Sequence, residues 1–239
     1  MSAAARVPAL AIDTATDVAS VAVGVSGRVV ARSIRGARQH AAQIVPLMQE
    51  VLALANVSLN DIKRIIVGDG PGSFTGLRIG WAAAKGLAHE RQLSLVAIPS
   101  LLGAAHAAGV NIAAACYDAL RGQVFGAVYA FTEDAVDVLM KPALFTISEL
   151  VDVTPALPVL AVGDGALRYR DEVEDWIGRP PVGLEELPPI AASLLALFDH
   201  DNARSAVDRS LAEPTYGRPA EAQVKWESRH GRPLPNSPR

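Results

Sequence analysis

A glycine-rich segment, residues 68–76 (GDGPGSFTG), indicates the clearest chemistry in the sequence, the binding of a phosphate. It joins a predicted strand to a predicted helix, and its glycines let successive backbone N–H groups turn toward one anion. The helix N-terminus adds about half a positive charge at the same point. The residues predicted to form this phosphate loop are Gly70, Gly72, Ser73, Thr75 and Gly76.

The loop does not match two catalytic motifs that also join a strand to a helix. A P-loop would place a lysine after its last glycine, and none follows Gly76. A nucleophile elbow would need glycine two residues before Ser73, where Pro71 stands. The alternative that stays open is a tight structural turn that binds nothing.

Two carboxylates occupy corresponding turns in the two halves of the chain. Asp13, followed by Thr14, ends one apolar strand, and Asp118 ends another. Beside a phosphate loop, such a carboxylate would hold a hydrated Mg²⁺, and Gly163 and Gly165 would line an adenosine. The alternative is that both carboxylates accept backbone N–H bonds within their own turns.

The two predicted helices of the first half are more apolar than one contact with a sheet requires. On the first helix, Ile44, Met48 and Val51 mark one face, and other apolar residues extend it. The second helix carries small residues beside Leu77 and Trp81, which we expect to be exposed. A wide apolar surface predicts a protein–protein interface; the alternative is burial on the sheet plus scattered apolar surface. The predicted partner surface is Ile44, Leu47, Met48, Val51, Leu77, Trp81 and Ala84.

No metal site and no catalytic set are predicted. The five histidines are scattered without a paired ligand spacing. The single cysteine, Cys116, excludes an internal disulfide and is expected to be a small buried residue of an apolar strand.

Composition narrows the class of protein. The 239 residues are 50% hydrophobic with a formal net charge of -3, which suits a packed core and disfavours a protein that binds nucleic acid by neutralising phosphates. Asp13 and Asp17 interrupt the apolar segment 7–25, and no signal peptide is recognisable, so we expect a cytoplasmic protein without a membrane span.

The order of elements must bring these residues together. Strands are expected at 8–14, 18–25, 28–34, 64–67, 95–98, 111–117, 123–131 and 158–162, and helices at 37–55, 75–90 and 189–199. Both halves begin with a strand, an aspartate and a hairpin strand. This repeat predicts an α/β protein of the actin-like ATPase (ASKHA) superfold, with two RNase H-like lobes of mixed sheets flanked by helices and an abbreviated second lobe. The predicted lobes are 1–105 plus about 205–226, and 106–204, with 227–239 a disordered tail.

Three segments resemble the TsaB family, also called YeaZ: LAIDTATDVASVAV at residues 10–23, residues 40–51, and GPGSFTGLRIG at residues 70–80. The likeness is clear from about residue 10 to residue 131 and weaker at 163–166 and 212–216. One departure is that Leu120 follows Asp118 and Ala119, where the family has arginine.

The resemblance implies a paralogue of the catalytic subunit TsaD with the same actin-like fold. TsaD carries a metal-binding histidine pair and transfers threonylcarbamoyl to a tRNA adenosine; Ser100 and Ala104 stand at the two positions here. The resemblance further implies that the two N-terminal helices bind the TsaD-like paralogue, that a TsaE-like ATPase joins them, and that tRNA is bound only within the complex.

The resemblance, together with the apolar helices, therefore implies a non-catalytic scaffold subunit for threonylcarbamoyladenosine modification, with no cofactor expected and no membrane contact. Residual binding of ATP or ADP with Mg²⁺ and a homodimer through the same helices stay open. On this hypothesis, charging Met48 or Trp81 leaves the fold intact and abolishes complex formation. The rival is an actin-like-fold enzyme, a small-molecule kinase or a glycoprotease-type hydrolase, although the sequence shows neither a metal nor an activated nucleophile for a peptidase.

Overall fold

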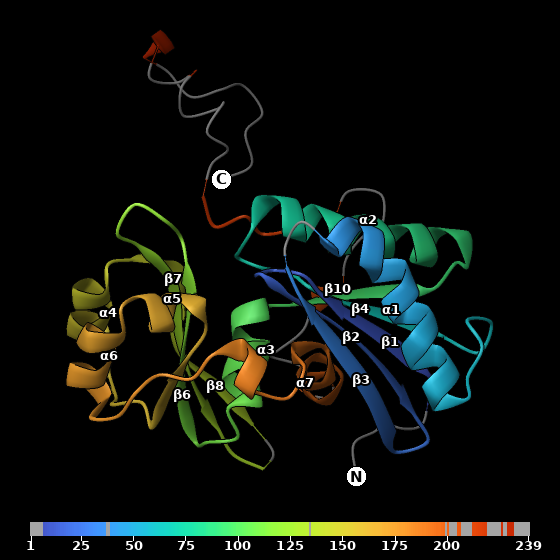
Figure 1. The fold of residues 1–239 in the computed structure, drawn as a ribbon, viewed down its shortest axis with the longest axis horizontal. Coiled ribbons are helices and arrows are strands. Elements are labelled where there is room, and N and C mark those ends of the chain that lie inside the picture. Colours follow the sequence, from blue (N-terminus) through green and yellow to red (C-terminus); the bar gives the residue numbers. More distant parts are fainter. Residues whose placement is uncertain are drawn as a thin grey trace.

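The computed structural model consists of two sheets that lie side by side, each covered by helices (Figure 1). It describes residues 7–36, 39–133, 135–198, 200, 205–206, 212–218, 226 and 229–231. The predicted α/β class, with two mixed sheets and a smaller second lobe, is confirmed. The predicted tail, 227–239, lies outside the described residues except for 229–231.

The first sheet contains β1 (Ala9–Asp13), β2 (Val18–Val25), β3 (Arg28–Arg35), β4 (Arg64–Gly68), β5 (Ser94–Ile98) and β10 (Ser205–Ala206). Its strand order is β10-β5-β4-β1-β2-β3. The first three strands form the predicted antiparallel meander, and β4 and β5 continue the sheet in parallel with β1. β1 is buried along its whole length because helices cover both faces of the sheet.

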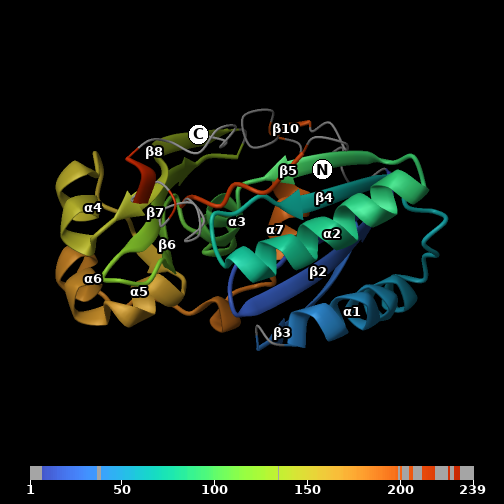
Figure 2. The ribbon, with the colours of Figure 1, turned by 90° about the horizontal axis from the view of Figure 1, so that it is seen from above.

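Helices α1 (His40–Ala55) and α2 (Phe74–Glu90) cover one face of this sheet, and α7 (Ile190–Leu197) covers the other (Figures 1 and 2). Side chains alternate along β1: Leu10 and Ile12 face α1 and α2, whereas Ala9 and Ala11 join the core around α7. α7 falls within the range predicted for the second lobe, but it packs against the first sheet. A helix this apolar on all sides requires burial between two layers.

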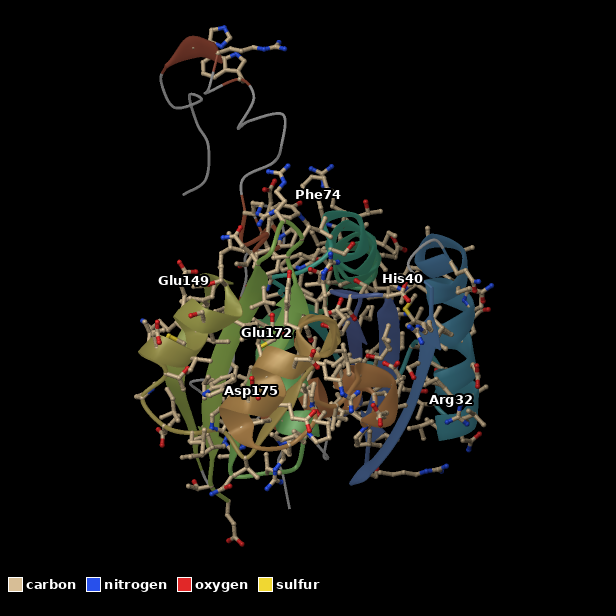
Figure 3. All side chains as sticks on the ribbon, turned by 60° about the vertical axis from the view of Figure 1, so that its left-hand side comes forward. Arg32, His40, Phe74, Glu149, Glu172 and Asp175 are labelled. Atoms are coloured by element: carbon tan, nitrogen blue, oxygen red, sulfur yellow. The ribbon has the colours of Figure 1, made fainter. Side chains whose placement is uncertain are left out.

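The second sheet contains β6 (Ile112–Asp118), β7 (Val124–Phe131), β8 (Val136–Phe145) and β9 (Leu160–Val162), in the order β8-β7-β6-β9. Helix α3 (Ser100–Ala107) packs on β6 and β7 and against α7, and so lies between the lobes. The outer helices are α4 (Ile147–Val153), α5 (Asp164–Arg168) and α6 (Arg170–Ile177), with a 3₁₀ turn at Leu184–Glu186. The acidic side chains of Glu149, Glu172 and Asp175 stand on this outer layer (Figure 3). Among the described residues, no helix combines the length and the apolar character needed to cross a bilayer.

Candidate functional site

A cavity of about 690 Å³ opens between the two lobes, within the size range of small-molecule sites. The structure brings the predicted loops together around it, although they are far apart in the sequence. Of the predicted residues, Gly72, Ser73 and Asp118 line the cavity. Asp13, Thr14, Gly70, Thr75, Gly76, Gly163 and Gly165 are not among its lining residues.

Aromatic residues form much of the cavity wall, and no motif in the sequence predicts this. The ring-bearing lining residues are Phe74, Tyr117, Phe125 and Tyr216. Phe74 begins α2 and lies where the two lobes meet (Figure 3). The four aromatic side chains come from α2, from β6 and β7, and from the segment 212–218, so only the tertiary structure brings them together.

Backbone N–H groups of the glycine loop are bonded within the chain itself. Gly70 N–H donates to the Ser100 hydroxyl (3.1 Å), Ser73 N–H to the Ala15 carbonyl (2.7 Å) and Gly76 N–H to the Ser73 hydroxyl (3.2 Å). A phosphate would have to displace the acceptors of these three N–H groups, which favours the structural interpretation of the loop.

The loop glycines are required by close packing. A Cβ on Gly72 would lie 2.2 Å from the Ala15 carbonyl oxygen, and one on Gly76 would lie 2.2 Å from the Thr14 carbonyl oxygen. The Thr14 hydroxyl also donates to the Gly76 carbonyl (2.7 Å). The start of α2 therefore rests directly on the backbone that follows β1, and this favours the structural interpretation of the loop.

Asp13 is buried and does not line the cavity. The Ser100 hydroxyl donates to its Oδ2 (2.5 Å), and Ala15 N–H donates to its Oδ1 (3.3 Å). Burial raises the pKa of Asp13 to about 6, partly offset by these two hydrogen bonds. A hydrated Mg²⁺ needs carboxylate oxygens that face its water shell, and Asp13 instead faces Ser100. In this arrangement Asp13 does not fit the predicted role of holding a hydrated Mg²⁺ beside a nucleotide.

We expect the stability of the protein to fall as the pH rises from about 4 to 6. Because the folded pKa of Asp13 lies above its ordinary value of 3.8, the folded state holds a proton that the unfolded chain releases in this range. At pH 7 the cost is about 2–3 kcal/mol. Asp13→Asn, which removes the charge and keeps an acceptor for Ser100, should raise the unfolding free energy at pH 7 by about 2 kcal/mol and flatten the pH profile.

Urea unfolding at a series of pH values measures this effect, with Asp175→Asn, an exposed change on α6, as the control. Some slope should remain in Asp13→Asn, because burial also raises the pKa of Asp164 to about 6. A variant whose profile matches that of the unmodified protein would show that Asp13 is not held in a dry site.

The second-lobe carboxylates organise the β6–β7 hairpin. Asp164 Oδ1 accepts the N–H of Asp118 (3.2 Å), Asp118 Oδ1 accepts the N–H of Leu120 (2.9 Å), and Arg168 pairs with Asp118 Oδ2 (2.8 Å). The alternative interpretation, that Asp118 accepts an N–H bond within its own turn, is confirmed. Leu120, which departs from the family pattern, has a left-handed φ of 62° and is exposed at the cavity edge.

Gly163 and Gly165 pack against the end of β6. A Cβ on Gly163 would lie 2.4 Å from the Cys116 carbonyl oxygen, and one on Gly165 would lie 2.7 Å from the Tyr117 carbonyl carbon. Like the first-lobe glycines, they allow two backbone segments to touch. Cys116 is buried, as expected.

The predicted partner surface needs a correction. Trp81 is 3% exposed and Leu77 is fully buried, so the expectation that these two residues are exposed is wrong. α1 packs against both the sheet and α2, and a helix with two contacts buries a wider apolar belt. All seven residues are buried within the chain: Ile44, Leu47, Met48, Val51, Leu77, Trp81 and Ala84.

The outward side of the same two helices forms a mostly apolar groove of about 330 Å³. Val45, 51% exposed, stands at this groove, and Met48 is the one predicted residue that reaches it. The full lining is Val45, Met48, Gln49, Leu52, Leu59, Ala82, Ala83, Gly86 and Leu87.

The family profile and the named relatives that this chain matches all concern the same modification of tRNA. Residues 32–169 match the profile of the TsaD family, described as tRNA N6-adenosine threonylcarbamoyltransferase. The chain is similar to tRNA threonylcarbamoyladenosine biosynthesis protein TsaB of Escherichia coli K12 (37% identical, over 56% of this chain and 63% of that protein) and of Bacillus subtilis 168 (27%, over 91% and 96%). It is also similar to an uncharacterized protein of Mycobacterium tuberculosis H37Rv (31%, over 73% and 82%).

Two solved structures share the fold. YeaZ from Pseudomonas aeruginosa superposes with a TM-score of 0.74 at 26% identity, over 88% of this chain and 100% of that one. A second Pseudomonas aeruginosa structure, of an uncharacterized protein with similarity to peptidase YEAZ, gives a TM-score of 0.74 at 28% identity, over 89% and 100%. The family resemblance and the fold class expected from the sequence are therefore confirmed.

Proposed function

The chain belongs to the TsaD family, described as tRNA N6-adenosine threonylcarbamoyltransferase, and we propose from this premise that it is a non-catalytic scaffold subunit for N6-threonylcarbamoyladenosine modification of tRNA. The observation that carries the non-catalytic part is the glycine loop. Its N–H groups at Gly70, Ser73 and Gly76 are bonded within the chain, and Asp13 faces Ser100. These bonds engage groups that an actin-like enzyme would need free to bind a nucleotide, and so they support a non-catalytic role.

The residues at the expected metal positions also support a non-catalytic role. Ser100 and Ala104, which the resemblance aligns with the histidine pair of the catalytic paralogue, lie one turn apart on α3 and are fully buried. Neither side chain offers an imidazole, and the Ser100 hydroxyl donates to Asp13.

The partner surface that we propose is the outward groove between α1 and α2, in place of the buried residues. Its occupant in this proposal is the TsaD-like paralogue, with a TsaE-like ATPase joining the complex and tRNA bound only within it; a second copy of this chain would compete for the same groove. Apolar lining and the half-exposed Val45 support this assignment. The proposal places the protein in the cytoplasm, with tRNA.

Reconstitution tests the function. The purified chain is combined with the TsaD-like and TsaE-like proteins and the carbamoyl-adenylate synthase of the same organism, and modified adenosine in tRNA is quantified with and without the chain. We expect modification only when the chain is present, and no ATP or peptide hydrolysis by the chain alone. Equal modification without the chain contradicts the scaffold role, and hydrolysis by the chain alone would revive the kinase or hydrolase alternative.

Val45→Glu should abolish binding to the TsaD-like paralogue while leaving the fold intact. A glutamate at a half-exposed helix position costs little in the free chain, but a buried interface would have to desolvate its charge. We expect a loss of at least ~100-fold in affinity, measured by calorimetry. Leu54→Glu is the matched control, because Leu54 is exposed on the same helix and does not line the groove. Equal losses in both variants would mean that the groove is not the contact.

A further inference from the structure

The segment 212–218 connects the two lobes across the cavity. It leaves the first lobe beside α2 and runs toward the second lobe (Figures 1 and 2). Tyr216 and Arg218 both line the cavity between the lobes. The segment is therefore placed to control how the lobes stand relative to each other at the cavity mouth.

Its contacts with the first lobe are specific. Thr215 N–H donates to the Asp69 carbonyl (2.9 Å), and the Thr215 hydroxyl donates to Asp69 Oδ2 (2.7 Å). The Tyr216 ring packs against Phe74 with 4.7 Å between centroids, and Arg78 Nε donates to the Tyr216 hydroxyl (3.2 Å). The Arg78 guanidinium also lies 4.0 Å from the Phe74 ring centroid, so the three side chains form one stack.

The next two residues reach the second lobe. Gly217 has a φ of 69°, and a Cβ there would lie 2.6 Å from Pro71 and 2.8 Å from the Phe125 ring. Only glycine therefore lets the chain pass between the first-lobe loop and β7. Arg218 then donates to Gln123 Oε1 (2.9 Å) at the β6–β7 hairpin.

We infer that residues 212–218 act as a built-in clasp, which holds the lobes at one angle and keeps the cavity mouth in one shape. Tyr216 is its first-lobe anchor and Arg218 its second-lobe anchor. Because these contacts are few and lie near the surface, the clasp can open without unfolding either lobe.

Hydrogen exchange of the full chain tests the clasp. Tyr216→Ala removes the ring stack and one hydrogen bond, so amides of residues 68–76 and of the hairpin turn 119–123 should exchange about tenfold faster, while β1 and β6 keep their protection. Gly217→Ala should also speed exchange of these amides, because the added methyl group crowds Pro71 and Phe125. Glu213→Ala, an exposed change in the same segment, is the control.

A distance measurement distinguishes a clasp from a merely local contact. Spin labels at Val29→Cys on β3 and Val153→Cys on α4, both exposed, report the separation of the lobes. Tyr216→Ala should broaden the distance distribution. An unchanged distribution, or faster exchange confined to residues 212–218, overturns the inference, because α3 and α7 would then fix the lobes without the clasp. Neither readout depends on the modification reaction.

Discussion

Replacing Trp81 by alanine will lower the free energy of unfolding by about 3–5 kcal/mol. Trp81 is 3% exposed and belongs to the core that α1 and α2 form with the first sheet. Removing the indole leaves a cavity among closely packed neighbours, which cannot fully collapse. Typical domains are stable by only about 5–15 kcal/mol, so the shift in the urea midpoint will be large.

Two companion variants show that this effect comes from lost volume. Trp81→Phe keeps most of the ring and removes Nε1–H, which has no hydrogen-bond partner among the described residues, so it should cost less than about 1.5 kcal/mol. Leu54→Ala, an exposed change on α1, should cost at most about 0.5 kcal/mol. If Trp81→Ala lowered the unfolding free energy by no more than Leu54→Ala does, Trp81 would have to be a surface residue after all. Because Met48 is 7% and Trp81 3% exposed, we now expect a charge at either position to destabilise the fold instead of leaving it intact.

The error over Trp81 shows what apolar periodicity can and cannot predict. The pattern correctly marks Ile44, Met48 and Val51 as one face of a helix. It does not say whether that face meets the chain's own sheet, a neighbouring helix or another protein. α1 touches both the sheet and α2, so the wide belt was explained by internal contacts that the sequence does not display.

The first lobe was predicted more completely than the second for a similar reason. Its strands are separated by clear turns, β1, β2, β4 and β5 are mostly buried, and each observed strand from β1 to β5 lies close to its expected range. In the second lobe, β8, α4, α5 and α6 were missed, as were α3 between the lobes and the two-residue strand β10 of the first sheet. β8 is largely half-exposed, and α6 buries only Val173 and Ile177. For α4 a signal was present: Thr146 and Glu149 form a capping box, recognisable as threonine followed three residues later by glutamate.

The meeting of the loops at one cavity followed from the repeated strand–aspartate–hairpin plan, because the ends of corresponding strands face each other in two related lobes. The role of the loops did not follow. A glycine that lets the backbone approach a phosphate cannot be distinguished in the sequence from a glycine that packs against a carbonyl. The distance from the glycine loop to Thr14 and Ala15 distinguishes them, and that distance is a property of the fold.

Alanine substitutions at two glycines of α2 measure this difference directly. A Cβ on Gly76 would lie 2.2 Å from the Thr14 carbonyl oxygen, so Gly76→Ala must push the helix away from β1 and should cost about 2–3 kcal/mol. A Cβ added to Gly86 would have no atom within 4 Å outside the backbone of its own helix, and alanine suits a helix interior better than glycine. Gly86→Ala should therefore raise the stability by about 0.5–1 kcal/mol.

Both variants make the same chemical change on the same helix, yet their unfolding free energies should change in opposite directions. The pair therefore reports on function as well as on packing. Urea unfolding of the ligand-free variants is sufficient. If Gly76 served a bound phosphate, its substitution would weaken ligand binding and leave the stability of the free protein nearly unchanged. A destabilised Gly76→Ala beside a stabilised Gly86→Ala means that the glycines hold α2 against the backbone after β1. Equal, mild effects at both positions would reopen the phosphate-binding alternative and, with it, the case for an enzyme.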